Sequence, residues 1–192
     1  MKPNKLTSVL IFMLVFVGGS IVVWNNTPLL RGRDAAASRA LTGAEAASAT
    51  VTTQMGRGLA PDFTLSSLQG EEIRLSEMRG QVVLVNFWAT WCPPCRFEMP
   101  AMQEVYETYR KRGFVILAVN FKEDEAQVRS FVDEFRLTFP VLLDKSGNVA
   151  AQYRVVGLPS SYFVDAKGRV QAVRVGAMDK EYMETQVRRL LK

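Results

Sequence analysis

Apolar and polar positions recur with different periods along the chain and divide it into three parts. Residues 6–24 form an uncharged apolar run that would be roughly 28 Å long as a helix, about the thickness of the hydrocarbon core of a bilayer. Residues 25–58 are rich in Ala, Ser, Thr and Gly and bury too little surface to offset the entropy of ordering. Residues 59–192 alternate strand-like and helix-like patterns. We therefore predict a transmembrane signal-anchor, a flexible linker and one folded domain, in that order.

The apolar run is expected to remain on the protein as an anchor. A cleaved signal peptide has a shorter apolar region, about 7–15 residues, with small residues at the cut close behind it. Here Trp24 and two asparagines come next, and the nearest Ala-x-Ala-like stretch, residues 35–37, lies far downstream. Lys2 and Lys5 precede the run, and their charge predicts that residues 1–5 are cytoplasmic. We therefore expect a single-pass protein of the cell membrane whose domain faces the periplasm or the cell exterior.

Within residues 59–192, buried apolar or alternating runs predict strands, and apolar spacings of three and four predict helices. Strands are predicted at Phe63–Leu65, Ile73–Leu75, Val82–Ala89, Phe114–Val119, Phe139–Leu142, 161–165 and 169–175. Helices are predicted after Cys95, over Val128–Phe135, over Asn148–Tyr153 and after Asp179, which can cap the last one. This alternation indicates an α/β fold, with a central mixed β-sheet, helices on both faces and an N-terminal β-hairpin.

The charge of the chain does not suggest a nucleic-acid partner. The net charge is +5, and the densest basic runs are Arg110–Arg112 and Arg188–Arg189. Both runs fall near the ends of amphipathic helices, where cations complement the negative end of the helix dipole. We expect solvated helix ends there, no nucleic-acid binding, and a monomer.

The two cysteines of the chain, Cys92 and Cys95, lie in the stretch NFWATWCPPCRFEMP, residues 86–100. The pair is placed where a buried strand leads into a helix. At a helix start the first sulfur lies near unpaired N–H groups and the positive end of the dipole, which lower the pKa of a thiol. Pro93 and Pro94 suit the first turn, where backbone donors are not needed. We therefore predict Cys92 as the nucleophile and Cys95 as the cysteine that resolves the mixed disulfide.

Other uses of two cysteines fit this sequence less well. A structural disulfide would close only a very short loop and so stabilise little. A metal site needs three or four ligands, and the chain has no histidine. A peroxidase of the peroxiredoxin kind usually has Thr or Ser three residues before its reactive cysteine, where this chain has Ala89. Thiol–disulfide exchange without metal or organic cofactor is the leading hypothesis. A thiol peroxidase and a non-enzymatic metal- or thiol-binding module remain alternatives.

With these motifs assembled, residues 59–192 resemble the thioredoxin superfamily. Within it they are similar to the membrane-anchored ResA/TlpA/CcmG type of extracytoplasmic thiol-disulfide oxidoreductase, a redoxin or AhpC/TSA-like domain. The resemblance rests on APDFTLSSLQG, on VLVNFWATWCPPCRFEMP and on GLPSSYFVDAKGRV. It implies a thioredoxin-like fold with a central insertion, for which Phe121 to Tyr153 is the candidate segment.

The resemblance also implies residues that bind the substrate. Pro159 matches a proline that is cis in this superfamily and faces the dithiol. The backbone of Leu158 would then pair with an extended segment of the substrate. Trp91, next to Cys92, is expected to cover the redox pair, with Pro93 and Pro94 beside it, whereas Trp88 is expected in the core.

Glu98 has two readings. It matches a glutamate that lies close to the dithiol in some ResA-like proteins, which implies a proton relay for Cys95. It could equally be a solvated carboxylate in the first turns of a helix, where the dipole favours negative charge. Many thioredoxins place a buried aspartate where this chain has Asn86, and an amide cannot accept a proton. Because Asn86 cannot act as a proton relay, Glu98 is the more interesting candidate for that role.

The resemblance finally implies partners. The substrate class that it implies is disulfides of extracytoplasmic proteins, among them the Cys-x-x-Cys-His haem-attachment motif of apocytochrome c. Re-reduction would come from a membrane thiol electron donor of the CcdA/DsbD kind. None of the residues of this chain specifies either partner, so both are expectations from family likeness.

Overall fold

The structure, a computed structural model, describes residues 58–192. The predicted cytoplasmic segment 1–5, the predicted anchor 6–24 and nearly all of the predicted linker 25–58 lie outside the described residues. Among residues 58–192, none of the helices combines the length and the apolar character needed to span a bilayer.

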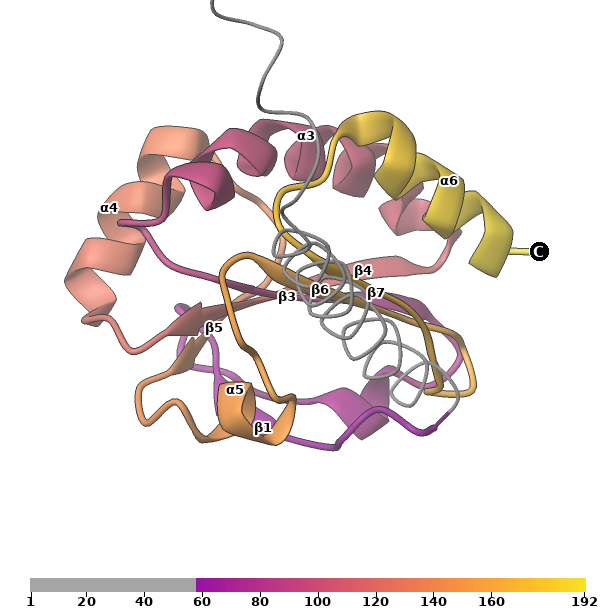
Figure 1. Ribbon diagram of the computed structural model, residues 1–192, viewed down its shortest axis with the longest axis horizontal. Helices are drawn as coiled ribbons and strands as arrows, with labels where there is room; N and C mark the ends of the chain where they lie inside the picture. The colour runs from indigo at the N-terminus through magenta and orange to yellow at the C-terminus, as the bar shows by residue number, and fades with distance from the viewer. Residues whose placement is uncertain (1–57) are drawn as a thin grey trace, which may run out of the picture. The chain divides into compact units, whose positions relative to one another are not determined.

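A five-stranded mixed sheet forms the centre of the fold, with the order β5-β4-β3-β6-β7 (Figure 1). Its strands are β3 Val82–Trp88, β4 Phe114–Phe121, β5 Val141–Asp144, β6 Ser160–Val164 and β7 Val170–Val175. Strands β3, β4 and β5 run parallel, whereas β6 is antiparallel to β3 and to β7. The predicted mixed sheet is confirmed.

Strand β3 is central because its apolar run allows burial on both faces. All seven of its residues are buried. Since side chains alternate across a strand, they feed two separate cores. Val82, Leu84 and Trp88 enter one core, and Val83, Val85 and Phe87 enter the other.

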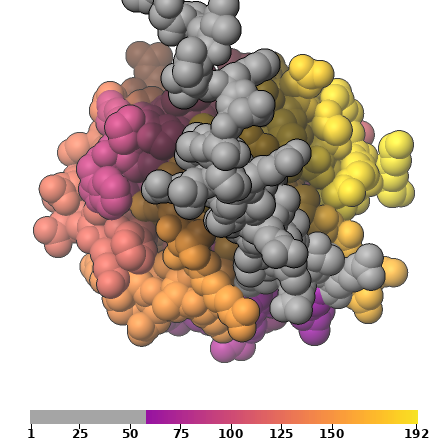
Figure 2. All heavy atoms as spheres, in the orientation of Figure 1, coloured from indigo at the N-terminus to yellow at the C-terminus, as the bar shows by residue number. Residues whose placement is uncertain are grey.

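Helices cover both faces of the sheet, as predicted. Helices α3 (Pro93–Tyr109), α4 (Glu125–Phe135) and α6 (Lys180–Leu190) pack on the first core, and the short α5 (Asn148–Gln152) packs on the second. In the ribbon and space-filling views α4 and α6 lie at opposite ends of their layer, and the ribbon shows α3 between them (Figures 1 and 2). Helix α3 therefore crosses the sheet with its amino-terminal end near the carboxyl end of β3.

The predicted N-terminal hairpin is present as β1 (Thr64–Ser66) and β2 (Glu72–Arg74), which form their own antiparallel sheet. Just after β1, the Leu68 N–H donates to the Val141 carbonyl at 3.0 Å. An edge strand with free backbone groups invites pairing with another chain. The hairpin segment satisfies part of the exposed edge of β5. A 3₁₀ turn at Leu75–Met78 precedes β3, and another at Arg110–Arg112 follows α3.

The two predicted hairpin strands and the strand predicted at 161–165 are each displaced by one residue, and one further strand is displaced by two. The pattern predicted Phe139–Leu142, whereas β5 covers Val141–Asp144. The Pro140 carbonyl accepts from the Ala118 N–H at 2.9 Å, but Pro140 lacks an N–H and cannot donate to the ladder, so the residue pairs with β4 begin at Val141. The candidate insertion, Phe121 to Tyr153, contains α4, β5 and α5, and its strand extends the central sheet.

Candidate active site

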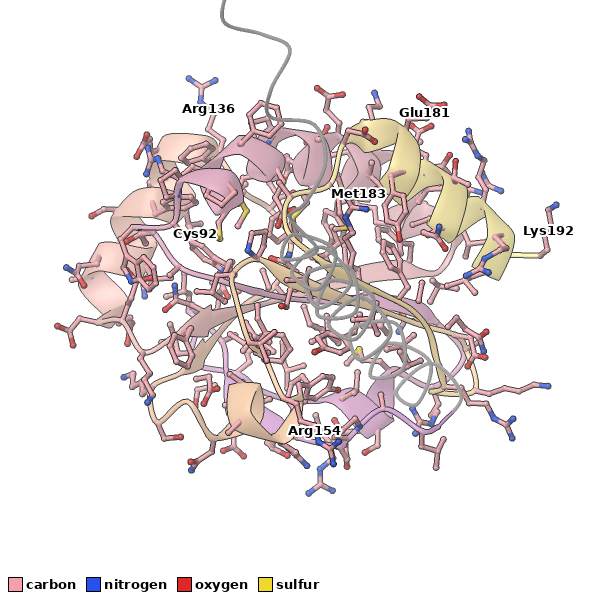
Figure 3. The ribbon with its side chains drawn as sticks, in the orientation of Figure 1. Cys92, Arg136, Arg154, Glu181, Met183 and Lys192 are labelled. Carbon is pink, nitrogen blue, oxygen red and sulfur yellow. A yellow bond between two sulfur atoms is a disulfide. The ribbon has the colours of Figure 1, made fainter. Side chains whose placement is uncertain are left out.

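Cys92 and Cys95 are joined in a disulfide at the start of α3. Figure 3 shows Cys92 at the sheet-facing side of this helix end. The side chain of Cys92 is 3 % exposed and that of Cys95 is fully buried. Both residues are therefore buried, and of the two only Cys92 retains contact with solvent and lines a surface groove. The division into nucleophile and resolving cysteine stays a prediction, which this difference favours.

The local sequence explains why α3 begins at this point. Cys92 is the N-cap in an extended conformation, and Pro93 and Pro94 occupy the first helical positions with a φ suited to them. The Cys95 N–H donates to the Cys92 sulfur at 3.3 Å, as a capping side chain accepts. The first sulfur is thus held at the positive end of a seventeen-residue helix.

An apolar groove of about 360 Å³ opens beside the disulfide. From the active-site turn it is lined by Trp91, Cys92, Pro93 and Pro94, and from elsewhere by Phe121, Val155, Val156, Gly157 and Leu158. Trp91 is 64 % exposed and Val156 is 87 % exposed, so large apolar side chains rim the groove. Trp88, in contrast, is buried in the core against the Phe131 ring.

The far wall of the groove is the turn that leads into β6. The Leu158–Pro159 peptide bond is cis; Pro159 is buried, and Leu158 lines the groove. Among residues 58–192, none accepts a hydrogen bond from the backbone N–H of Val156 or of Leu158. The groove therefore carries backbone donors that an extended peptide could use.

Glu98 is fully buried, which excludes the solvated-carboxylate reading. Its two oxygens accept from Asn86 Nδ2 at 2.8 Å and from the Met178 N–H at 2.9 Å. Burial raises the pKa of Glu98 from 4.5 to about 7, and the two hydrogen bonds oppose that rise. Cys95 and Glu98 are three apart on α3 and so share one face of the helix. A carboxyl with a pKa of about 7 on that face can hold or release a proton at physiological pH.

Within residues 58–192, no three acidic or cysteine side chains cluster in the manner of a metal site. Both cysteines are occupied by the disulfide. The side chains that line the groove are apolar and uncharged.

Comparison with known proteins assigns this geometry to a family. Residues 57–173 match the AhpC/TSA family. The chain belongs to the AhpC/TSA family. Thioredoxin-like protein YneN of Bacillus subtilis is 48% identical over 128 residues, which cover 65% of this chain and 74% of YneN. Thiol-disulfide oxidoreductase ResA of Geobacillus kaustophilus is 46% identical over 125 residues, covering 65% of this chain and 72% of ResA.

A solved structure agrees with these AhpC/TSA relatives. A thiol:disulfide interchange protein of Chlorobium tepidum superposes with a TM-score of 0.65 at 30% identity, covering 71% of this chain and 97% of that chain. The protein therefore has a thioredoxin-like fold and is a thiol-disulfide oxidoreductase. The Cys92–Cys95 pair is the redox couple that this activity needs.

Some residues of the AhpC/TSA site were not singled out from the sequence. Phe121, Val155 and Val156 line the groove, yet each reads as an ordinary apolar residue in the chain. Buried Glu123, which binds the turn before Cys92, carried no recognisable motif either. The one available signal was position, because Phe121 ends β4, Glu123 follows it, and Val155 and Val156 precede the cis-proline turn.

Proposed function

We propose that this protein reduces disulfides of extracytoplasmic proteins while residues 6–24 tether it to the cell membrane. The observation that carries the proposal is the Cys92–Cys95 disulfide opening onto an apolar, largely uncharged groove. Both cysteines are buried, but Cys92 lines the groove and Cys95 does not, so a client that enters the groove would meet Cys92 first.

The cycle begins with the reduced pair. The Cys92 thiolate attacks one sulfur of the client disulfide, forming a mixed disulfide and releasing the first client thiolate, which takes up a proton. The Cys95 thiolate then attacks the Cys92 sulfur, forms Cys92–Cys95 and releases the second client thiolate. Two electrons have passed to the client. A second protein must return two electrons to Cys92–Cys95 before the next cycle.

Glu98 is proposed to handle the proton of Cys95. Cys95 must lose its proton before it can attack, and its fully buried side chain has no direct contact with water. The Glu98 carboxylate, with its pKa of about 7, is the titratable group on the same helix face. It would accept the proton as Cys95 attacks and return it when the pair is reduced again.

The groove is proposed to bind an extended segment of the client. Trp91, Val156 and Leu158 present apolar surface to the side chains of the client, and apolar burial is the main source of affinity for such segments. The N–H groups of Val156 and Leu158 would pair with the client backbone, as in strand addition. The absence of charge from the lining favours clients with neutral residues beside the cysteine.

The partners are proposed by analogy with relatives. Geobacillus ResA and the Chlorobium protein are named for thiol–disulfide chemistry. We propose an apocytochrome c, with its Cys-x-x-Cys-His motif kept reduced for haem attachment, as one client. We propose a membrane thiol donor of the CcdA/DsbD kind as the source of electrons.

The direction of electron flow is tested by titrating the couple. The full chain in detergent is equilibrated with glutathione buffers, and reduction is followed by tryptophan fluorescence and by thiol alkylation. A potential near or below about −220 mV supports a reductant supplied by a membrane donor. A value near about −120 mV would make the protein an oxidant and overturn the proposal. Absence of a reversible couple would do the same.

A further inference from the structure

A second buried carboxylate lies behind the active-site turn. Glu123 follows β4 and is 8 % exposed. Its Oε2 accepts from the Thr90 N–H at 2.7 Å and from Asn120 Nδ2 at 2.7 Å, and its Oε1 accepts from Thr90 Oγ1 at 2.5 Å. Thr90 is two residues before Cys92. One side chain therefore joins the turn that carries the dithiol to the loop that follows the neighbouring strand.

Burial of the Glu123 carboxylate costs free energy unless the group is compensated by partners. Within residues 58–192, Glu123 has no Lys or Arg within ion-pair distance, so its compensation comes from neutral donors. A buried charge without a cation survives where hydrogen bonds to it are well made. The preceding Lys122 has a φ of 57°, a left-handed conformation that non-glycine residues hold only where the surroundings enforce it. The loop is thus constrained immediately before Glu123 and at the Glu123 side chain itself.

The position of the contact links Cys92 to the groove wall. Trp88 and Asn120 are register partners at the carboxyl ends of the parallel strands β3 and β4. Beyond this pair the two segments diverge: one leads to Cys92, and the other continues through Phe121. Phe121 and Cys92 line the same groove. Glu123, two residues after Phe121, connects the two segments again through Thr90. It thereby fixes the spacing between the reactive sulfur and the Phe121 side of the groove.

We propose that Glu123 is a positioning residue for disulfide reduction. Its carboxylate, through Thr90 and Asn120, holds the Cys92 turn in register with the Phe121 side of the groove. A client bound in the groove then presents its disulfide to a sulfur at a fixed distance and angle. The inference rests on the proposed use of the groove by an extended client.

The role predicts an effect that depends on the size of the substrate. A small disulfide needs the Cys92 sulfur alone, whereas a peptide must satisfy the groove and the sulfur together. Misplacement by a fraction of an ångström to 1 Å can cost as much as about a hundredfold in rate when two contacts must be met at once. Loss of Glu123 should therefore slow peptide reduction far more than reduction of a small disulfide.

The experiment uses the pre-reduced full chain in detergent and follows its oxidation by stopped flow. The two substrates are bis(2-hydroxyethyl) disulfide and an apolar decapeptide whose single cysteine is disulfide-bonded to glutathione. The variants are Glu123→Ala, Glu123→Gln and Thr90→Val. The glutamine oxygen can still accept from the Thr90 N–H, and its NH₂ can donate to Thr90 Oγ1. Thr90→Val removes the hydrogen bond between Thr90 Oγ1 and Glu123 at nearly constant side-chain shape. It tests the same contact if Glu123→Ala does not fold.

The expected result is a loss of about tenfold or more in the second-order rate constant of Glu123→Ala for the peptide, with less than about threefold for the small disulfide. Glu123→Gln should stay within about threefold of the parent on both substrates. Thr90→Val should also lose more rate on the peptide than on the small disulfide, but its loss should be smaller than that of Glu123→Ala. Equal loss on the two substrates, or no loss in any variant, overturns the positioning role. A parent protein that reduces neither substrate overturns the proposed function itself.

Discussion

Asn86 on β3 donates from Nδ2 to Glu98 on α3 at 2.8 Å, and both side chains are fully buried. The same Nδ2 group donates to Ser161 Oγ on β6 at 2.9 Å. On its other side Glu98 accepts from the Met178 N–H in the segment between β7 and α6. One carboxylate therefore ties the dithiol helix to the sheet and to the segment that leads into the last helix.

Replacing Glu98 with Gln should remove a pH-dependent loss of stability. The unfolded chain releases this proton near pH 4.5 and the folded chain near about 7, so the folded state binds more protons between these values. The free energy of unfolding therefore falls as pH rises from about 4.5 to about 7, by up to about 3 kcal/mol. Glu98→Gln does not titrate and should lack this contribution.

The measurement is urea denaturation of the oxidised parent and of Glu98→Gln at pH 5 and pH 8, with the disulfide intact so that no thiol titrates. The stability of the variant relative to the parent should increase from pH 5 to pH 8. A constant difference between the two pH values would contradict the raised pKa of Glu98.

Asn86→Asp should destabilise the fold in a pH-dependent way. The new carboxyl would face Glu98 across a hydrogen-bonding distance, and two carboxylates that close cannot both ionise without a large penalty. At pH 8 we expect a loss of about 3–5 kcal/mol, and at pH 5 a much smaller one because the pair retains a proton. Asn86→Ala serves as the control for loss of the amide alone. A loss in Asn86→Asp that is equal at both pH values would sink this account.

Cys95→Ser should trap clients on Cys92. Cys92 lines the groove and Cys95 is fully buried, so an incoming disulfide should react with Cys92 and then cannot be resolved. Non-reducing electrophoresis after exposure to a client peptide disulfide should show the adduct in Cys95→Ser and none in Cys92→Ser. Adducts that form on Cys92→Ser instead would reverse the assigned roles.

Trp91→Phe should abolish most of the redox-dependent fluorescence. Trp91 lines the groove with Cys92 and is 64 % exposed, whereas Trp88 is buried on the Phe131 ring. Reduction of the disulfide removes a quencher next to Trp91 and changes its surroundings more than those of Trp88. Emission spectra of the oxidised and reduced forms of parent and variant test this. A change that persists undiminished in Trp91→Phe would assign the signal to another tryptophan.

Elements whose signals are local could be predicted from the sequence. The unbroken apolar run of β3 indicated a strand covered on both faces, and all of its residues are buried. Asp179 was predicted to cap the last helix, and it accepts from the Tyr182 N–H at 2.8 Å. Cys92 and Cys95 were recognised because the spacing of a dithiol on a helix start is itself local. The shift of β5 at Pro140 could not be predicted locally, because the effect of the proline depends on how β5 pairs with β4.

Contacts between distant segments could not be predicted in the same way. Thr90 and Glu123 are 33 residues apart and meet because β3 and β4 are parallel neighbours, and strand order is not a property of either run. The groove likewise combines Phe121 with Val156, which no periodicity relates. Burial of Glu98 depended on packing of α3 against the sheet, so the sequence left two readings open.

The two prolines of the active-site turn bear on how readily the protein gives up electrons. A side chain that caps a helix commonly accepts from the N–H of the second or third residue. Here the second residue is Pro94, and the Cys95 N–H, at 3.3 Å, is the donor that remains to Cys92. A thiolate at Cys92 is therefore held by fewer backbone donors than the same helix end would supply without prolines. Since each such bond favours the reduced pair, its absence shifts the couple toward passing its electrons on.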